Sequence, residues 1–189
     1  MQDWREAHRF THDRAGDGKP PAGQRERAAR RGIAIRESGP CQFCGAAVSG
    51  GVEQCLAWYA DVSGRIFQDP AYAAVHLFGV DAHALQHPEI HGRSNNNFHL
   101  LSLGVMLERG GSAQAGQRRA FLDRTLSGEI PMPPLDPPPP LQRGAVTVAD
   151  VYAAATPREH QAQVRAWARA VWDAWAQHHA WAREVLKQL

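Results

Sequence analysis

The residues best suited to chemistry are three cysteines and a group of histidines in the first two thirds of the chain. Cys41 and Cys44 are separated by two residues, and Cys55 is the third cysteine. The stretch from His76 to His99 holds five of the ten histidines. Two thiolates in a Cys-x-x-Cys segment can reach one ion, at Zn–S distances of about 2.3 Å, and zinc prefers Cys and His ligands. We therefore expect a transition-metal site, with zinc as the ion.

A second group of residues with chemical potential lies near the C-terminus. It combines four tryptophans and two adjacent histidines: Trp167, Trp172, Trp175, Trp181, His178 and His179. Core packing accounts for the tryptophans. The alternative is an aromatic-walled pocket in which one histidine binds a metal or acts as a base. Asp81 is a candidate partner for these groups, because a carboxylate buried among apolar neighbours needs a hydrogen-bond donor or a cation.

The composition limits the other function classes. A chain of 189 residues can form one domain with a substantial core. The formal net charge of +2 provides no overall attraction for nucleic acid or an anionic membrane. No apolar run approaches the ~18 residues that span a bilayer, and the first residues lack the apolar region of a secretory signal. We expect a cytoplasmic protein, in which cysteines serve as metal ligands rather than disulfides.

Two segments differ in composition from the rest. Residues 1–38 are basic and almost without periodic apolar residues, so we expect a disordered arm. Residues 39–189 form the predicted single domain. Within it, residues 131–140 contain seven prolines and predict an extended connector. This connector either lies over the surface of its own domain or binds an aromatic groove of a protein partner.

The remaining pattern is helical. It predicts helices over residues 52–66, 70–87, 95–109 and 117–126, a short helix from Thr147, and a last helix from Pro157 nearly to Leu189. Asp69 before a proline is a start signal, and Pro88 is a stop signal. Thr156 and Glu159 form a capping box at the last helix, whose apolar residues recur at steps of four and three. The predicted fold is an all-α helical bundle with an N-terminal Cys-x-x-Cys knuckle and a long C-terminal helix.

Helix geometry selects among the histidines. His76, His83 and His87 fall on one face of the predicted second helix, within about 40°. However, His76 and His87 are separated by about 16 Å along the axis, so one ion cannot bind both. His83 and His87 are about 6 Å apart in rise and can share an ion.

The order of the helices then brings the ligands together. The first two helices are joined by a short link and should pack antiparallel, which places Cys55 beside the end of the second helix. The Cys-x-x-Cys knuckle enters at the same end. We predict that Cys41, Cys44, Cys55 and His87 bind the metal. His83 and His99 are reserves, either of which can replace Cys55, whereas His76 should lie further along the bundle.

Several short motifs occur together: Cys-x-x-Cys-Gly at 41–45, a cysteine before an aromatic residue at 55–58, Val-Asp-x-x-x-x-Gln-His-Pro at 80–88, Phe-His-Leu at 98–100, Leu-Glu-Arg-Gly at 107–110 and the Trp/His-His pattern of 167–179. With them, the chain resembles a bacterial family known only as a domain of unknown function, over residues 40–185. In that family a tyrosine is more usual where this chain has His83, which weakens His83 as a ligand. The resemblance supports the ligand choice and implies no activity.

Three functions follow as hypotheses. The leading one is a small cytoplasmic helical protein that binds zinc and has an accessory or regulatory role. The second is a metal-dependent enzyme with a centre of Asp81, His76 and His178 or His179 in the bundle core. The third is a protein-interaction module that uses the basic arm and the proline-rich segment.

Overall fold

The computed structural model describes residues 28–91, 93–108, 116, 120, 121, 123–125, 127–130 and 142–187. These residues form helices and one isolated β-bridge, between Gly39 and Gly50, and contain no strand. The predicted all-α class is confirmed. The expected arm falls mainly on residues 1–27 and the proline-rich connector on 131–140, and both stretches lie outside the described residues. The helix predicted over 117–126 is described only in part, and positions 120, 121 and 123–125 are helical.

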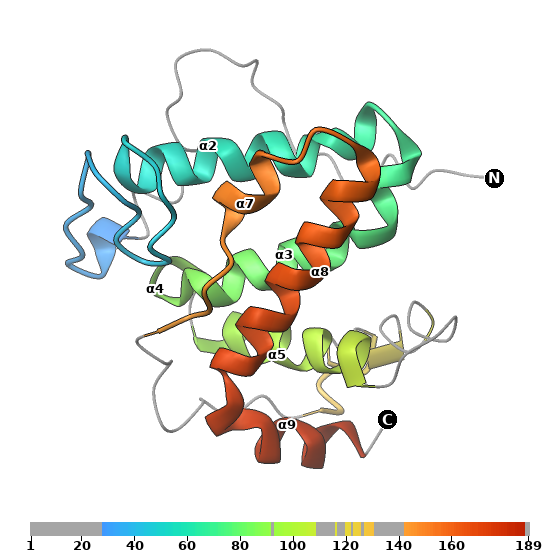
Figure 1. Ribbon diagram of the computed structural model, residues 1–189. Helices are drawn as coiled ribbons and strands as arrows, with labels where there is room; N and C mark the ends of the chain where they lie inside the picture. The colour runs from blue at the N-terminus through green and yellow to red at the C-terminus, as the bar shows by residue number, and fades with distance from the viewer. Residues whose placement is uncertain are drawn as a thin grey trace.

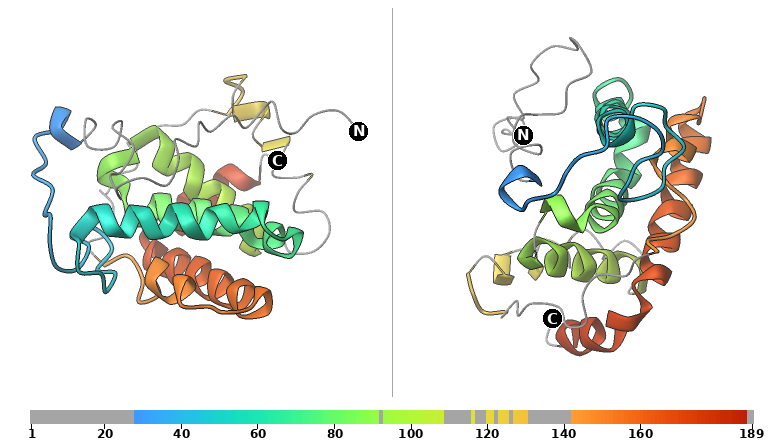
Figure 2. Two further views of the ribbon diagram at one scale, coloured as in Figure 1. Left: turned by 90° about the horizontal axis from the view of Figure 1, so that it is seen from above. Right: turned by 90° about the vertical axis from the view of Figure 1, so that its left-hand side faces the viewer.

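The helices pack around α8, Pro157–Ala174, which runs between α2, Gly51–Gly64, and α9, His179–Leu186 (Figure 1). α3, His76–Gln86, packs against both α8 and α5, Arg93–Glu108. The short helix α7, Val148–Tyr152, covers α2, and α5 contacts α9 (Figure 2). No helix in the described ranges combines the length and the apolar character needed to cross a lipid bilayer.

The loop before α2 carries the two cysteines of the Cys-x-x-Cys segment, and we call residues 39–50 the knuckle. Gly51, the first residue of α2, has φ +60°, and a Cβ there would lie 2.1 Å from the carbonyl oxygen of Arg36. Glycine is therefore required at this close approach. The side chain of Gln54 accepts hydrogen bonds from the backbone N–H groups of Ser49 and Gly50, at 2.8 and 2.7 Å. These bonds fix where α2 begins, and hence where Cys55 lies.

The helix predicted over residues 70–87 begins at Pro70 and ends at Gln86. The Asp69 side chain accepts a hydrogen bond from the Ala71 N–H at 2.8 Å, as a helix cap does. The first turns are a 3-10 helix, η2, Pro70–Val75, and α3 follows. α3 ends at Gln86 because Pro88 cannot continue it, and a short helix, α4, Pro88–His91, starts there.

The predicted C-terminal helix is interrupted. The Thr156 capping box and Pro157 start α8 as expected, but α8 ends at Ala174 and a 3-10 turn, η3, Ala176–His178, leads into α9. The imidazole Nε2 of His179 donates to the carbonyl oxygen of Trp172 at 2.9 Å. The same carbonyl also accepts a hydrogen bond from the Trp175 N–H at 2.9 Å, so a backbone and a side-chain donor both bond the last turn of α8.

The core lies where α3, α5, α8 and α9 meet. Trp167, Trp172 and Trp175 are 0, 2 and 0% exposed. Gly104 of α5 lets Trp172 approach closely, since a Cβ there would meet the indole at 2.9 Å. Three tryptophans in this layer account for the tight packing of the C-terminal segment, which we define as residues 157–186.

Candidate metal centre

The structure brings Cys41, Cys44, Cys55 and His87 into one cluster. The Sγ atoms of Cys44 and Cys55 are 3.7 Å apart. His87 Nε2 lies 3.6 Å from Cys41 Sγ and 3.5 Å from Cys55 Sγ. All four donor atoms lie within 4.8 Å of one another. Two of them come from the knuckle, one from α2 and one from the residue that follows α3.

These spacings fit a tetrahedral ion. With Zn–S bonds of about 2.3 Å and a Zn–N bond of about 2.05 Å, the edges of the tetrahedron are about 3.8 Å between sulfurs and about 3.6 Å between sulfur and nitrogen. Three of the six donor–donor distances, at 3.5–3.7 Å, match these edges. A disulfide would instead require sulfurs about 2.05 Å apart, and all three cysteines are free. The four residues can therefore hold one ion without moving far.

His87 is oriented for binding by its backbone neighbour. Its Nδ1–H donates to the carbonyl oxygen of His83 at 2.7 Å. That bond leaves Nε2 as the available donor atom and points it at the sulfurs, as the outer contacts of metal-bound histidines do. His87 is fully buried.

His83, a reserve ligand, lies beside the cluster but outside it. Its ring is stacked between Tyr59, with centroids 3.7 Å apart, and His87, with centroids 4.1 Å apart. The His83 ring lies 8° from the plane of Tyr59 and 27° from that of His87, and His83 is not among the residues whose donor atoms converge. Cys55, and not His83 or His99, lies with Cys41, Cys44 and His87 in the cluster.

The knuckle is shaped by its own backbone bonds. The Cys41 N–H donates to the Ala46 carbonyl at 3.0 Å, and the Gly45 N–H donates to the Cys41 carbonyl at 2.9 Å. Gly45 has φ +74°, a conformation that glycine adopts without strain. The tight turn brings both knuckle cysteines to the same side, facing α2.

Arg143 is a supporting residue that the sequence did not indicate. Its guanidinium donates to the carbonyl oxygens of Phe43, at 3.2 Å, and Gln86, at 3.3 Å. It also forms an ion pair with Glu89 of α4, with one N–O distance of 2.9 Å. The arginine side chain is 8% exposed. It thus ties the knuckle to the end of α3, immediately beside His87.

The cluster also shifts the pKa values of its members. Hydrogen bonds with Cys44 and Cys55 lower the pKa of the Cys41 thiol. Hydrogen bonds with Cys41 and Cys44, together with burial, raise the pKa of the Cys55 thiol. Burial by itself lowers the pKa of His87, but hydrogen bonds to Cys41 and Cys44 raise it to about 10. A metal ion must therefore displace protons from Cys55 and His87, while Cys41 supplies a ready thiolate.

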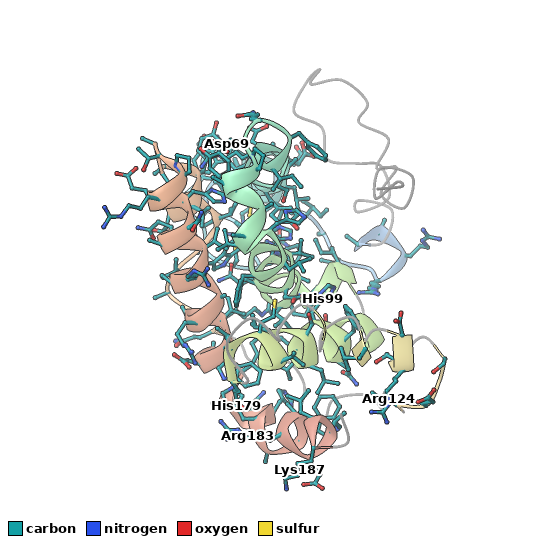
Figure 3. All side chains as sticks on the ribbon, turned by 90° about the vertical axis from the view of Figure 1, so that its right-hand side faces the viewer. Asp69, His99, Arg124, His179, Arg183 and Lys187 are labelled. Carbon is teal, nitrogen blue, oxygen red and sulfur yellow. The ribbon has the colours of Figure 1, made fainter. Side chains whose placement is uncertain are left out.

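His99, the other reserve, belongs to a different group. Its Nδ1 lies 2.8 Å from Oδ1 of Asp81, and the Ser102 hydroxyl donates to the other carboxylate oxygen at 2.6 Å. Asp81 is fully buried, so these contacts meet the need for donors that its burial creates. His99 lies on α5, well separated from His179 on α9 (Figure 3). Both of these partners, His99 and Ser102, lie on α5, which the sequence did not indicate for Asp81.

The other predicted residues of the enzyme hypothesis are dispersed. His76 lines a small pocket beside η2. His178 packs against Trp175, with centroids 5.4 Å apart, and His179 stacks on Trp172, with centroids 4.0 Å apart. The imidazoles of His178 and His179 are thus used in ring packing and in hydrogen bonds, to the Gln177 side chain and the Trp172 carbonyl respectively.

Across the described ranges, the Cys/His cluster is the one set of three or more His, Cys, Asp or Glu residues close enough to hold a single ion. The alternative centre of Asp81, His76 and His178 or His179 is therefore not assembled there. The predicted ligands converge at the knuckle, and the tryptophan-rich segment forms core.

The chain belongs to the family of unknown function DUF5946, whose profile matches residues 39–176. That match begins at the knuckle, includes all four cluster residues and ends within the C-terminal segment. Neither a curated protein nor a solved structure matches the chain significantly. The family assignment confirms the resemblance and leaves function to be argued from the site.

Proposed function

Starting from a family without an assigned activity, we propose that this protein binds one zinc ion through Cys41, Cys44, Cys55 and His87. The observation that carries the proposal is the spacing of the four donor atoms, which lie within 4.8 Å of one another with contacts of 3.5–3.7 Å. The three contacts of 3.5–3.7 Å match the edges of a zinc tetrahedron. The ion would be held by residues from three separate parts of the chain.

The ligand chemistry favours zinc over other ions. Thiolates select soft and borderline metals, and three sulfurs with one imidazole nitrogen are a common zinc set. Magnesium and calcium require oxygen ligands. Four protein ligands also complete the coordination, whereas a catalytic zinc keeps a position open for water. We therefore assign the centre a structural role and the protein an accessory or regulatory one.

The proposed ion would complete the fold at one end of the bundle. The knuckle contributes two ligands, α2 contributes Cys55, and His87 marks the end of α3. Because a preformed site is absent in an unfolded chain, the free energy of metal binding becomes free energy of folding. A reducing compartment, which we take to be the cytoplasm, suits three free thiols.

Metal analysis of the reduced, purified protein tests the proposal. We expect about one equivalent of zinc per chain, since four ligands serve one ion. Cys41→Ser and His87→Gln should each lower the zinc content. His83→Gln is the matched control, because His83 is an equally buried imidazole one turn earlier, and this variant should keep its zinc. Zinc-free wild-type protein, or equal losses in the two histidine variants, would refute the assignment.

A further inference from the structure

The four donors of the candidate centre differ in their exposure. Cys41, Cys55 and His87 are 2, 0 and 0% exposed, whereas Cys44 is half-buried. Cys44 also lines a surface groove between the knuckle and α8, whose far wall includes Ala170 and Ala174. Cys41 lines the groove too but is only 2% exposed, so a small solute in the groove meets the half-buried Cys44 first.

A second sulfur lies next to the accessible one. Cys55 Sγ is 3.7 Å from Cys44 Sγ, and bond formation requires an approach to about 2.05 Å. Cys55 lies on the first turns of α2, held in place by the Gly51 approach and the Gln54 cap. Cys44 is therefore well placed to react first and Cys55 to follow.

We propose that Cys44 is the site at which hydrogen peroxide oxidises the centre, and that the Cys44–Cys55 disulfide formed afterwards expels the metal ion. The proposal rests on the zinc centre proposed above. In the first step, the Cys44 sulfur attacks the peroxide, the O–O bond breaks, and with one proton from solvent the products are a sulfenic acid and water. In the second step, the Cys55 sulfur attacks the sulfur of the Cys44 sulfenic acid and forms the disulfide. The hydroxyl group of the sulfenic acid takes up another proton and leaves as water.

The balance of this reaction explains the loss of metal. The two cysteines give up two electrons, and the peroxide is reduced to two molecules of water. Zinc loses two thiolate ligands together, and Cys41 and His87 alone cannot complete its coordination. The disulfide still joins the knuckle to α2, but the link to the end of α3 through His87 is lost. Oxidation would thus leave Arg143 as the contact between the knuckle and the end of α3, and so weaken that attachment.

Zinc release from the loaded, reduced full-length chain tests the proposal. Zinc content is measured before hydrogen peroxide is added, and released zinc is then followed with a chromogenic chelator. We expect about one zinc per disulfide formed, with peptide mapping that identifies Cys44 joined to Cys55. Dithiothreitol and added zinc should restore the starting content. A first disulfide that contains Cys41, or zinc retained at peroxide levels that oxidise free cysteine, would overturn the proposal.

Two variants that keep all four ligands test the role of the groove. Ala174→Leu adds volume to the groove wall and should slow zinc release. Ala166→Leu places the same change at an exposed position of α8 and should leave the rate unchanged. Equal rates in both variants would count against access through the groove. If the starting protein holds no zinc, the metal assignment itself fails, whereas zinc that is bound but not released contradicts the oxidation step alone.

Discussion

The knuckle and the C-terminal segment are both rich in residues capable of chemistry, yet they use them in opposite ways. In the knuckle and its neighbours, three thiols and one imidazole point their donor atoms at a common centre. In the C-terminal segment, His179 stacks on one tryptophan and bonds its carbonyl, and His178 packs on another. Residue type alone therefore does not distinguish a metal-binding region from a packed core. The convergence of the donor atoms does.

The two regions also differ in what holds them in place. The C-terminal segment buries three tryptophans against α3 and α5, so apolar packing is sufficient for it. The knuckle has no regular helix or strand beyond one bridge. It depends on a few backbone bonds, on Arg143 and, in our account, on the ion. Perturbations should therefore affect stability and zinc content separately.

Removal of the metal should have the largest effect, and it should be confined to the knuckle side. Structural zinc contributes on the order of 10 kcal/mol in zinc-finger peptides, so a chelator should lower the melting temperature sharply. Hydrogen exchange should show lost protection around Cys41 and Cys55 and retained protection in α8. Added zinc should reverse both changes. A melting curve that is unchanged after complete metal removal would show that the knuckle does not depend on the ion for its stability.

Truncation of a core tryptophan should produce the opposite pattern. Trp172→Ala should lower the free energy of unfolding by about 3–5 kcal/mol, as for other large core truncations, with zinc content unchanged at temperatures where the variant is folded. Chemical denaturation and metal analysis measure the two quantities. Trp58→Ala is the matched control, because Trp58 is only half-buried and should cost less. Loss of zinc from the folded Trp172→Ala variant would contradict the claim that the C-terminal segment and the metal centre respond independently.

The pH dependence should differ between the metal-free and the zinc-loaded protein. Without metal, the lowered pKa of Cys41 makes the free energy of unfolding rise with pH up to the usual His value of 6.5. Between pH 6.5 and the usual Cys value of 9.0, His87 keeps its proton in the folded protein, where its pKa is about 10, and loses it in the unfolded chain. This proton cancels the rise caused by Cys41, so the free energy of unfolding is level in this range. Above pH 9.0 the protons retained by Cys55 and His87 make stability fall.

Zinc affinity should instead keep rising between pH 6.5 and 9.0, because zinc binding removes the protons of Cys55 and His87. Each proton released on binding adds about 1.4 kcal/mol per pH unit to the affinity. Competition with a chelator at several pH values gives the affinity, and denaturation of metal-free protein gives the stability. If both quantities are level between pH 6.5 and 9.0, the proton account of the centre is wrong.

Loss of Arg143 should have the smallest effect of the set. Arg143→Met removes bonds to the carbonyls of Phe43 and Gln86 and the pair with Glu89. Hydrogen bonds from charged groups contribute about 1.5–3 kcal/mol, so zinc should dissociate faster. Stopped-flow transfer to a chelator measures that rate.

Arg183→Met is the control from the C-terminal segment. Its pair with Glu108 involves an arginine side chain that is 55% exposed, and exposed pairs contribute about 0–1 kcal/mol. The variant should leave the zinc dissociation rate unchanged. Equal rates in the Arg143 and Arg183 variants would remove the supporting role that we assign to Arg143.

Much of the fold and of the candidate site followed from local signals in the sequence. The Asp69 cap and Pro88 located the second helix, and the rise per residue excluded His76 from a site that contains His87. The choice between His83 and His87 could not be made locally, because both lie on one helix face. The ring of Tyr59, from another helix, decides it by stacking on His83.

Other features had no local signal. Arg143 is 57 residues from Gln86 in sequence, and a lone arginine carries no spacing pattern. The break after Ala174 lacks the glycine or proline that usually marks a helix end, and the His179 side chain that bonds the last turn there carries no sequence signal for it. The need of Asp81 for a partner was predictable from its apolar neighbours, but the identity of that partner depended on how α5 packs on α3.

X-ray absorption at the zinc edge of the reduced, zinc-loaded protein tests the central claim most directly, since it reports the ligand atoms themselves. Three thiolates and one imidazole predict a first shell of three sulfurs at about 2.3 Å and one nitrogen at about 2.0–2.1 Å. Cys44→Ser should reduce the sulfur contribution by one. A shell of nitrogen and oxygen without sulfur would contradict the account, because the ion would then be bound away from the knuckle.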